Sequence, residues 1–282
     1  MSDSDLDWAS GVDLTKPNAA RIYNYFIGGK DWFDADMQEA ERLHQLSPFL
    51  RLGMRENRHF LRRAVGVLGD AGIRQYLDIG AGLPSAGNVH EVAQHVNPDA
   101  RVIYVDLDPV VLAQARALTA HDDKVRVLAG DVRDIKAILD DSVVQTFIDW
   151  TEPVAVLMTG LLHFVLDEYR PKHLVGQVRD RMVPGSALAL SHGTLDAVEQ
   201  FLPSSATSAA LGEWRRTEVL ALRRREEFEG LFEGFELLPP GVVWAPQWRP
   251  DGIGEGQPPE ACGIYVGVGR VPVHVTSAAR VA

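Results

Sequence analysis

Cysteine is nearly absent: the chain of 282 residues has only Cys262, so no disulfide can form within it. This scarcity is typical of a reducing compartment, and a cytoplasmic location is the simplest expectation. Basic residues are also in the minority, with 28 Lys and Arg against 39 Asp and Glu and a formal net charge of −11. A chain this acidic lacks the basic surface that nucleic acid or an anionic membrane requires, which disfavours both partners.

Long apolar runs are missing as well. The longest, residues 153–166, is too short to span a bilayer and contains His163. The N-terminal sequence MSDSDLDWAS is acidic and polar, unlike a signal peptide. No group of cysteine and histidine residues has metal-site spacing, so no metal is expected. With 46% hydrophobic and 24% charged residues, the composition is that of an ordinary globular protein.

Strand-like and helical segments alternate from residue 75 onward. Apolar runs of strand length recur at 75–79, 101–106, 125–129, 154–158 and 186–191, with two further runs at 235–238 and 263–268. Such alternation predicts an α/β fold with a parallel sheet covered by helices on both faces. Residues before 75 have helical spacing instead, over 18–26, 34–46 and 51–69. We therefore expect an N-terminal helical segment, residues 1–74, and an α/β core, residues 75–282.

The first strand leads into a loop that contains Gly80 and Gly82 but lacks the third glycine of a dinucleotide-binding loop, because Ser85 stands there. A phosphate at the following helix N-terminus would also meet Asp78, the carboxylate at the strand end. This combination disfavours a nicotinamide cofactor. It suits S-adenosylmethionine, which has no phosphate: Asp78 can attract the cationic methionine part, and the two glycines let the backbone approach closely.

Acidic residues also follow the next two strands. Asp106 ends the second strand, where a carboxylate can accept hydrogen bonds from both ribose hydroxyls. Asp131, followed by Val132, comes after the third strand, where it can meet an adenine amino group. Each aspartate alone has a plain structural explanation, since Asp commonly caps a helix after a strand. Their occurrence in register with three successive strands favours a bound adenosine.

The sequence resembles class I S-adenosylmethionine-dependent methyltransferases, and within them an actinobacterial family formerly of unknown function. The resemblance covers nearly the whole chain. It rests on PNAARIYNYFIGGKDWF at 17–33, ENRHFLRRAV at 56–65, YLDIGAGLPSAGNVHEVAQ at 76–94, VIYVDLDPVVLAQARAL at 102–118, AGDVRD at 129–134, LLHFVLDEYRP at 161–171 and PPGVVWAPQWRP at 239–250. It implies a Rossmann-like seven-stranded sheet with an antiparallel last strand, S-adenosylmethionine as cofactor and methyl transfer as activity, but it supplies no acceptor.

The chain departs from the family pattern at two positions. Trp32 stands where a small polar residue, usually Asn, is expected after Gly-Gly-Lys-Asp, and this change could alter the acceptor pocket. Leu107 stands where Asn is frequent, between two aspartates, and should matter little.

Aromatic residues of the first helix suggest a lid. Tyr23, Tyr25 and Phe26 precede Gly28-Gly29, a candidate hinge about which the N-terminal helical segment could close over the cofactor. Tyr23 could place its ring near the sulfonium, and Tyr25 with Trp32 could border the acceptor. The same residues could instead only pack the helix against the domain.

Catalytic residues are not dictated by the reaction, because methyl transfer needs a general base only where the acceptor must lose a proton. His163, just past the fourth strand, is the candidate, although a core histidine is the slightly preferred explanation for it; His192 is a weaker candidate. The Asn-Pro-Pro-Tyr signature of adenine or cytosine amino methylation and a Pro-Cys nucleophile are both missing. We therefore expect a small-molecule acceptor. A non-catalytic S-adenosylmethionine-binding protein, acting as a sensor or through a partner, remains the alternative.

Two other features leave their roles open. Arg55, Arg58 and Arg62 share one helix face, which could meet an acidic acceptor or the ligand carboxylate, or could simply be solvated. The loop at 239–261, with Trp244 and Trp248, could border an acceptor pocket or cover the sheet.

Overall fold

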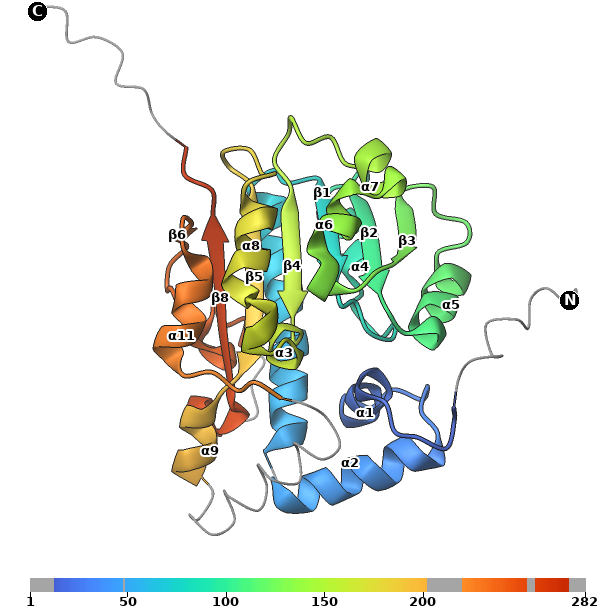
Figure 1. Cartoon of the computed structure of the whole chain (residues 1–282), viewed down its shortest axis with the longest axis vertical. Helices are drawn as coiled ribbons and strands as arrows, with labels where there is room; N and C mark the ends of the chain where they lie inside the picture. Colours follow the sequence, from blue (N-terminus) through green and yellow to red (C-terminus); the bar gives the residue numbers. More distant parts are fainter. Residues whose placement is uncertain (1–12, 48, 202–219, 253–256, 274–282) are drawn as a thin grey trace, which may run out of the picture.

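The computed structural model describes residues 13–47, 49–201, 220–252 and 257–273. A mixed sheet lies at its centre, with helices on both faces (Figure 1). The strands are β1 (Gln75–Ile79), β2 (Arg101–Asp106), β3 (Val125–Ala129), β4 (Ala155–Thr159), β5 (Ala187–Gly193), β6 (Glu236–Leu237), β7 (Val243–Trp244) and β8 (Ile264–Arg270). The α-helices are α1 (Ala19–Phe26), α2 (Asp34–Leu46), α3 (Leu50–Asp70), α4 (Val89–Val96), α5 (Pro109–Leu118), α6 (Ile135–Asp140), α7 (Ser142–Phe147), α8 (Pro171–Arg179), α9 (Leu195–Phe201) and α11 (Arg225–Glu229).

The sheet has the order β3-β2-β1-β4-β5-β8-β6, and β7 pairs separately with β8. Strands β1 to β5 are parallel, and β8 is antiparallel to β5 and to both of its other neighbours. The predicted Rossmann-like sheet with an antiparallel last strand is confirmed. The eighth strand is β7, whose two residues are too few to produce a recognisable alternation in the sequence.

The central strands β1, β2, β4, β5 and β8 are largely buried on both faces, as their continuous apolar runs predict, whereas the edge strand β3 is partly exposed. On one face Leu77 and Val156 belong to a core packed beneath α6 and α8. On the other face Tyr76 and Leu157 belong to a core that also contains Phe60 of α3. Helix α3 is therefore built into the packing of the sheet, while α1 and α2 lie beyond the carboxyl ends of the parallel strands (Figure 1).

The part of the chain that contains Trp244 and Trp248 covers the face of the sheet against which α3 packs. Arg63 of α3 donates hydrogen bonds from Nε to Trp248 O at 2.9 Å and from Nη2 to Ala245 O at 2.7 Å. Trp248 is fully buried, with its ring edge-to-face against Phe60 at 5.4 Å between centroids. Trp244 stacks on Tyr265, with 4.0 Å between the two ring centroids. Of the two readings of this loop, the structure therefore supports a cover of the core.

Two further properties concern only the described part of the chain. No helix there is long and apolar enough to cross a membrane. No group of three or more His, Cys, Asp or Glu side chains in the same residues is arranged to hold a metal ion.

Candidate active site

The loop after β1 wraps around the end of β2. The backbone N–H groups of Gly80 and Ala81 donate to Val105 O, at 2.8 and 3.2 Å. Gly80 and Gly82 have φ angles of 73° and 65°, a left-handed conformation that favours glycine. A Cβ atom added at Gly82 would meet no atom within 4 Å, so the backbone here borders open space that a ligand can enter.

Asp106, at the end of β2, is held by this loop. Its Oδ2 accepts a hydrogen bond from Gly82 N, and its Oδ1 accepts one from Asp108 N, both at 2.9 Å. Burial raises the pKa of Asp106 above its ordinary value, and the two backbone hydrogen bonds oppose the rise. Because a carboxylate has about four acceptor positions, Asp106 can still accept from further donors such as ribose hydroxyls.

Asp78 of β1 and Arg58 of α3 line one pocket together with Gly82. Asp78 is 3% exposed, and burial, opposed in part by the Arg58 guanidinium, raises the pKa of its carboxyl to about 7. Arg58 donates to Asn88 Oδ1 at 3.2 Å, but its buried Nε has no hydrogen-bond partner among the described residues. The pocket thus presents a carboxylate and an incompletely paired guanidinium, which complement the ammonium and carboxylate of an amino acid.

Asp131 and Val132 lie beyond β3, beside the end of β2. Asp131 accepts hydrogen bonds from N and Nε of Arg133, both at 2.9 Å, and this ion pair lowers the pKa of Asp131. Val132 is buried at the start of a short 3₁₀ helix, Val132–Asp134. Leu107 follows Asp106 directly and is 62% exposed, so an apolar surface lies next to the predicted ribose residue.

Tyr23 of α1 contacts helix α3 through its hydroxyl. Its hydroxyl donates to Met54 O at 2.9 Å and accepts from Asn57 Nδ2 at 3.0 Å. Burial raises the pKa of Tyr23, and the nearby Arg58 opposes the rise. Asn57 Oδ1 in turn accepts a hydrogen bond from Ser191 Oγ at the end of β5. A chain of hydrogen bonds therefore joins α1, α3 and β5.

Tyr25 and Trp32 form a separate pair on the other side of α1. Their rings meet edge-to-face with 5.2 Å between centroids. The Tyr25 hydroxyl bonds to Glu41 of α2, and Trp32 Nε1 donates to Gly29 O at 3.0 Å. Neither residue belongs to the group formed by Asp78, Arg58 and Gly82, so the structure does not bring them to the predicted cofactor residues.

His163 lies in a 3₁₀ turn after β4, Leu162–Phe164, and faces the end of β5. Its Nδ1 accepts a weak hydrogen bond from Gly193 N at 3.4 Å, which leaves the ring proton on Nε2. Burial and, after it, the charge of Arg223 lower the pKa of His163 to about 4, so the ring is neutral at pH 7. His192 is 5.5 Å away between ring centroids and is also neutral, because burial and His163 lower its pKa.

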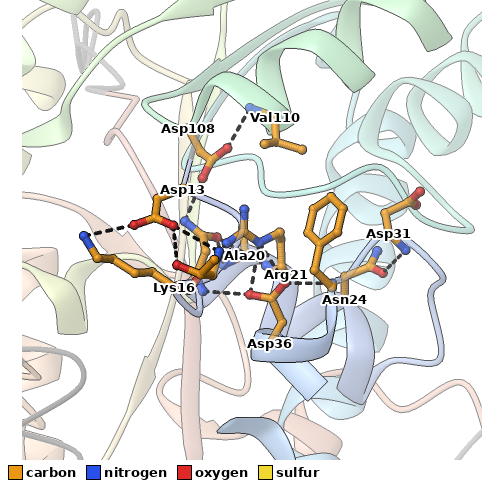
Figure 2. Close-up of polar contacts among 12 residues, drawn as sticks. Asp13, Lys16, Ala20, Arg21, Asn24, Asp31, Asp36, Asp108 and Val110 are labelled. Carbon is orange, nitrogen blue, oxygen red and sulfur yellow. Dashed lines mark hydrogen bonds and ion pairs between the residues drawn. The ribbon is translucent and has the colours of Figure 1, made fainter. Parts of the chain in front are cut away.

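Helix α1 is docked on the loops that follow β1 and β2. Asn18, its N-cap, donates from Nδ2 to Asp108 Oδ2 at 2.6 Å. Asp108 itself accepts from Val110 N at the start of α5 (Figure 2). Behind this contact Arg21 and Asp36 form a fully buried ion pair at 2.9 Å, which joins α1 to α2 (Figure 2). The N-terminal helices therefore cover the end of the sheet where the glycine loop and Asp106 lie.

Comparison with known proteins identifies the family to which this chain belongs. Residues 7–272 match the S-adenosyl methyltransferase family. The chain belongs to this family. Two solved structures share the fold at a TM-score of 0.85: a methyltransferase candidate from Thermobifida fusca YX and a DUF574 family protein from Streptomyces avermitilis. The first is 40% identical and covers 93% of this chain and 98% of its own; the second is 38% identical and covers 92% and 99%.

More distant structures share the fold alone. An O-methyltransferase family protein from Burkholderia thailandensis is 16% identical at a TM-score of 0.50, covering 92% of this chain and 65% of its own. No match is found among curated protein sequences. The predicted family is confirmed, and the protein is an S-adenosylmethionine-dependent methyltransferase.

The residues of this methyltransferase suit its cofactor in chemistry as well as in fold. Open space borders Gly82, the unpaired Nε of Arg58 is a donor without an acceptor, and Asp78 is a buried carboxylate without a hydrogen bond among the described residues. A ligand with an ammonium and a carboxylate would satisfy both charged groups at once.

Sequence reasoning missed two residues of this region, Asn57 and Ser191, and did not distinguish a third, Arg58, from its neighbours. Arg58 was visible only as one of three arginines on a helix face, without a sign that it, rather than its neighbours, meets the pocket. Asn57 and Ser191 carry no local signal at all, because they are 134 positions apart and meet only in the folded chain.

Proposed function

We propose that this methyltransferase transfers the methyl group of S-adenosylmethionine to a small-molecule acceptor in the cytoplasm. The observation that carries the proposal is the cover over the cofactor loops, where Asn18 bonds to Asp108 and Ala20 packs against Leu83 and Val110. A covered site can enclose a small acceptor, whereas a polymer needs an open groove. The net charge of −11 supports the same choice. Cys262 is buried and free, as suits a reducing compartment.

The cofactor assignment follows the order of the strands. We assign the methionine ammonium to Asp78, its carboxylate to Arg58, and the close backbone contact to Gly80 and Gly82. The ribose is assigned to Asp106. At the adenine we place Asp131 with the backbone of Val132, and the exposed face of Leu107 against the ring. The hydroxyl of Tyr23 lies near Arg58 and supports a place for its ring beside the sulfonium.

The bound cofactor supplies an activated methyl group, and the chain has to orient the acceptor in line with it and exclude water. We assign His163 to the acceptor side. Because its Nδ1 accepts from Gly193 N, Nε2–H is available as a hydrogen-bond donor toward an acceptor oxygen or nitrogen. Tyr25 and Trp32 would border the acceptor only if it extends toward α2.

The N-terminal segment, residues 1–74, divides in this proposal into a lid and its anchor, with residues 75–282 as the core. Helices α1 and α2 form the lid, joined by the buried Arg21–Asp36 pair. Helix α3 is the anchor, because its apolar face belongs to the packing of the sheet.

A turnover screen tests the acceptor class. The purified protein would be incubated with S-adenosylmethionine and pools of small hydroxyl, amine and carboxylate compounds, and S-adenosylhomocysteine would be measured against a no-acceptor control. Total RNA, DNA and denatured protein would form separate arms. Turnover with a small-molecule pool supports the proposal, whereas turnover confined to a polymer arm contradicts it.

Replacing Asp106 by Ala should weaken S-adenosylmethionine binding by about 1–3 kcal/mol, because the ribose hydroxyls lose their acceptor. The same loss is expected for adenosine, which shares the ribose. Calorimetric titration of both ligands measures it. An unchanged affinity in a variant with a normal circular dichroism spectrum would rule out Asp106 as the ribose residue.

Replacing Asn18 by Ala removes both the α1 cap and the contact to Asp108. A lost cap costs about 0.5–2 kcal/mol of stability. Because the lid is also released, we expect the cofactor to dissociate several-fold faster, as measured by stopped-flow fluorescence. Asp141→Ala is the matched control, since Asp141 caps α7 through Val143 N at 2.7 Å. Equal dissociation rates in the two variants would argue against a lid.

A further inference from the structure

We propose that a second cavity, between the start of α8 and α11, binds a small organic anion, a phosphate or carboxylate on a compact apolar body. The cavity has a volume of about 350 Å³, at the lower end of the range for small-molecule sites. It shares no lining residue with the cofactor pocket. Pro171 and Leu231 supply apolar surface, and three cations supply charge, Arg170, Lys172 and Arg223.

The charge balance of the cavity favours an anion. Its two acidic residues are already engaged: Asp167 accepts from Arg223 Nη2 at 2.6 Å, and Glu227 accepts from Arg224 N at 2.8 Å. The side chains of Arg170 and Lys172 make no hydrogen bond or ion pair within the described part of the chain. Two cations at the rim are therefore free to meet a ligand.

The backbone at Arg170 is strained. Its φ and ψ angles are 54° and 61°, and only Arg249 shares a positive φ among the described non-glycine residues. The strain is greater because Pro171 follows, and a residue before proline prefers an extended conformation. Such backbone is unfavourable and is concentrated at functional sites. The fold thus maintains an unfavourable turn at the residue that lines the cavity.

Arg223 connects the cavity with the loop after β4. It is only 6% exposed. Nη2 donates to Val165 O and Nη1 to Leu162 O, each at 2.9 Å, so the guanidinium holds the backbone on both sides of His163. Nη1 also lies 2.9 Å from Nε2 of His192. The residue at the base of the cavity is therefore the residue that fixes this loop.

The Asp167 carboxylate pairs with Arg223, and an anionic ligand can replace it in this pair. Its side chain is 88% exposed, and an ion pair with so exposed a partner contributes little stability. An incoming phosphate or carboxylate that also contacts Lys172 and Arg170 would bond to Arg223 Nη2 in its place. Because His192 touches the same guanidinium, its ring resonances should respond to occupation of the cavity.

Binding of phenyl phosphate and benzoate, with benzyl alcohol as the uncharged control, tests the proposal. Calorimetry should detect one or both anions and not the alcohol. The Arg170→Ala/Lys172→Ala double variant should bind at least about tenfold more weakly, because charged hydrogen bonds are lost. Arg116→Ala, which removes an exposed arginine from α5, should bind normally. In nitrogen-15 spectra the anion should shift the His192 ring signals of the wild type and leave those of the double variant unchanged.

The proposal would be overturned by no binding of either anion, by equal binding in the double variant, or by His192 signals that do not move. Displacement of the anion by S-adenosylhomocysteine would do the same, since it would place the anion at Arg58 in the cofactor pocket. Cofactor affinity is measured on the same samples. A failure of the second site is therefore distinguishable from a failure of the proposed methyl transfer.

Discussion

Asp78→Asn should stabilise the ligand-free protein by up to about 4 kcal/mol at pH 8 and at the same time weaken S-adenosylmethionine binding about 10- to 100-fold. The first effect follows from burial, which raises the pKa of Asp78 from 3.8 to about 7, a shift of about three units at 1.36 kcal/mol each. The second follows from the lost charged hydrogen bond to the ammonium, worth about 1.5–3 kcal/mol. A substitution that raises stability but weakens cofactor binding distinguishes a functional carboxylate from a structural one.

The sign of the stability change depends on pH. Between pH 3.8 and about 7 the folded protein keeps a proton on Asp78 that the unfolded chain has released, so stability falls as the pH rises through this window. Asparagine has no such proton. The free energy of unfolding of the variant should therefore exceed that of the wild type by an amount that grows from about pH 4 upward. The difference should be largest above pH 7. His163 and His192 titrate in both proteins and cancel in the comparison.

Urea unfolding of both proteins at pH 5, 6.5 and 8 measures this change. The gap in unfolding free energy should widen with pH, at equal m-values. Asp131→Asn is the matched control, because its ion pair lowers the pKa of Asp131 and its loss should not stabilise the fold. A gap that stays constant with pH would contradict the assigned pKa. Binding of the cofactor to the wild type should also strengthen as the pH rises through 7, and binding to the variant should not.

The grouping of the proposed cofactor residues could be predicted from the sequence because parallel strands bring their carboxyl ends to one edge of the sheet, while their role at the cofactor stays a prediction. Asp78 lies near the end of β1, Gly80 and Gly82 follow that strand, and Asp106 ends β2, so a correct order of strands suffices to bring them together. The structure adds the contact that links them, between Gly82 N and the Asp106 carboxylate. No long-range information beyond the strand pattern was needed.

The other side of the site depends on packing, which a single sequence does not specify. Arg58, rather than Arg55 or Arg62, lines the pocket in the orientation that α3 adopts on the sheet, and α3 packs there against residues distant in the sequence, such as Trp248. The same holds for Tyr23, whose hydroxyl bonds to Asn57 of α3. Tyr25, two positions later on the same helix, bonds to Glu41 of α2 instead.

Arg58→Met should weaken binding of S-adenosylmethionine and S-adenosylhomocysteine by about 2–5 kcal/mol, because a buried guanidinium that pairs with the ligand carboxylate is lost. Methionine keeps most of the apolar stem of the side chain. The effect on Asp78 adds to the loss: Arg58 now lowers the pKa of that carboxyl, so its removal should raise the pKa further and leave Asp78 more protonated at pH 7. The substitution would thus remove the positive charge of Arg58 and reduce the negative charge of Asp78 at the same time.

A ligand without the amino acid part isolates this contribution. 5′-Methylthioadenosine has the adenosine and the sulfur but neither the ammonium nor the carboxylate, so its affinity should be the same in wild type and Arg58→Met. Arg62→Met is the control from the same helix, since Arg62 does not line the pocket. Calorimetry with both ligands separates the possibilities. Equal losses for the two would mean that the variant disturbs the adenosine site, and an unchanged affinity for S-adenosylhomocysteine would mean that the carboxylate is held by another residue. A loss confined to the amino acid ligand identifies Arg58 as its partner, because only that ligand carries the charge that Arg58 can bind.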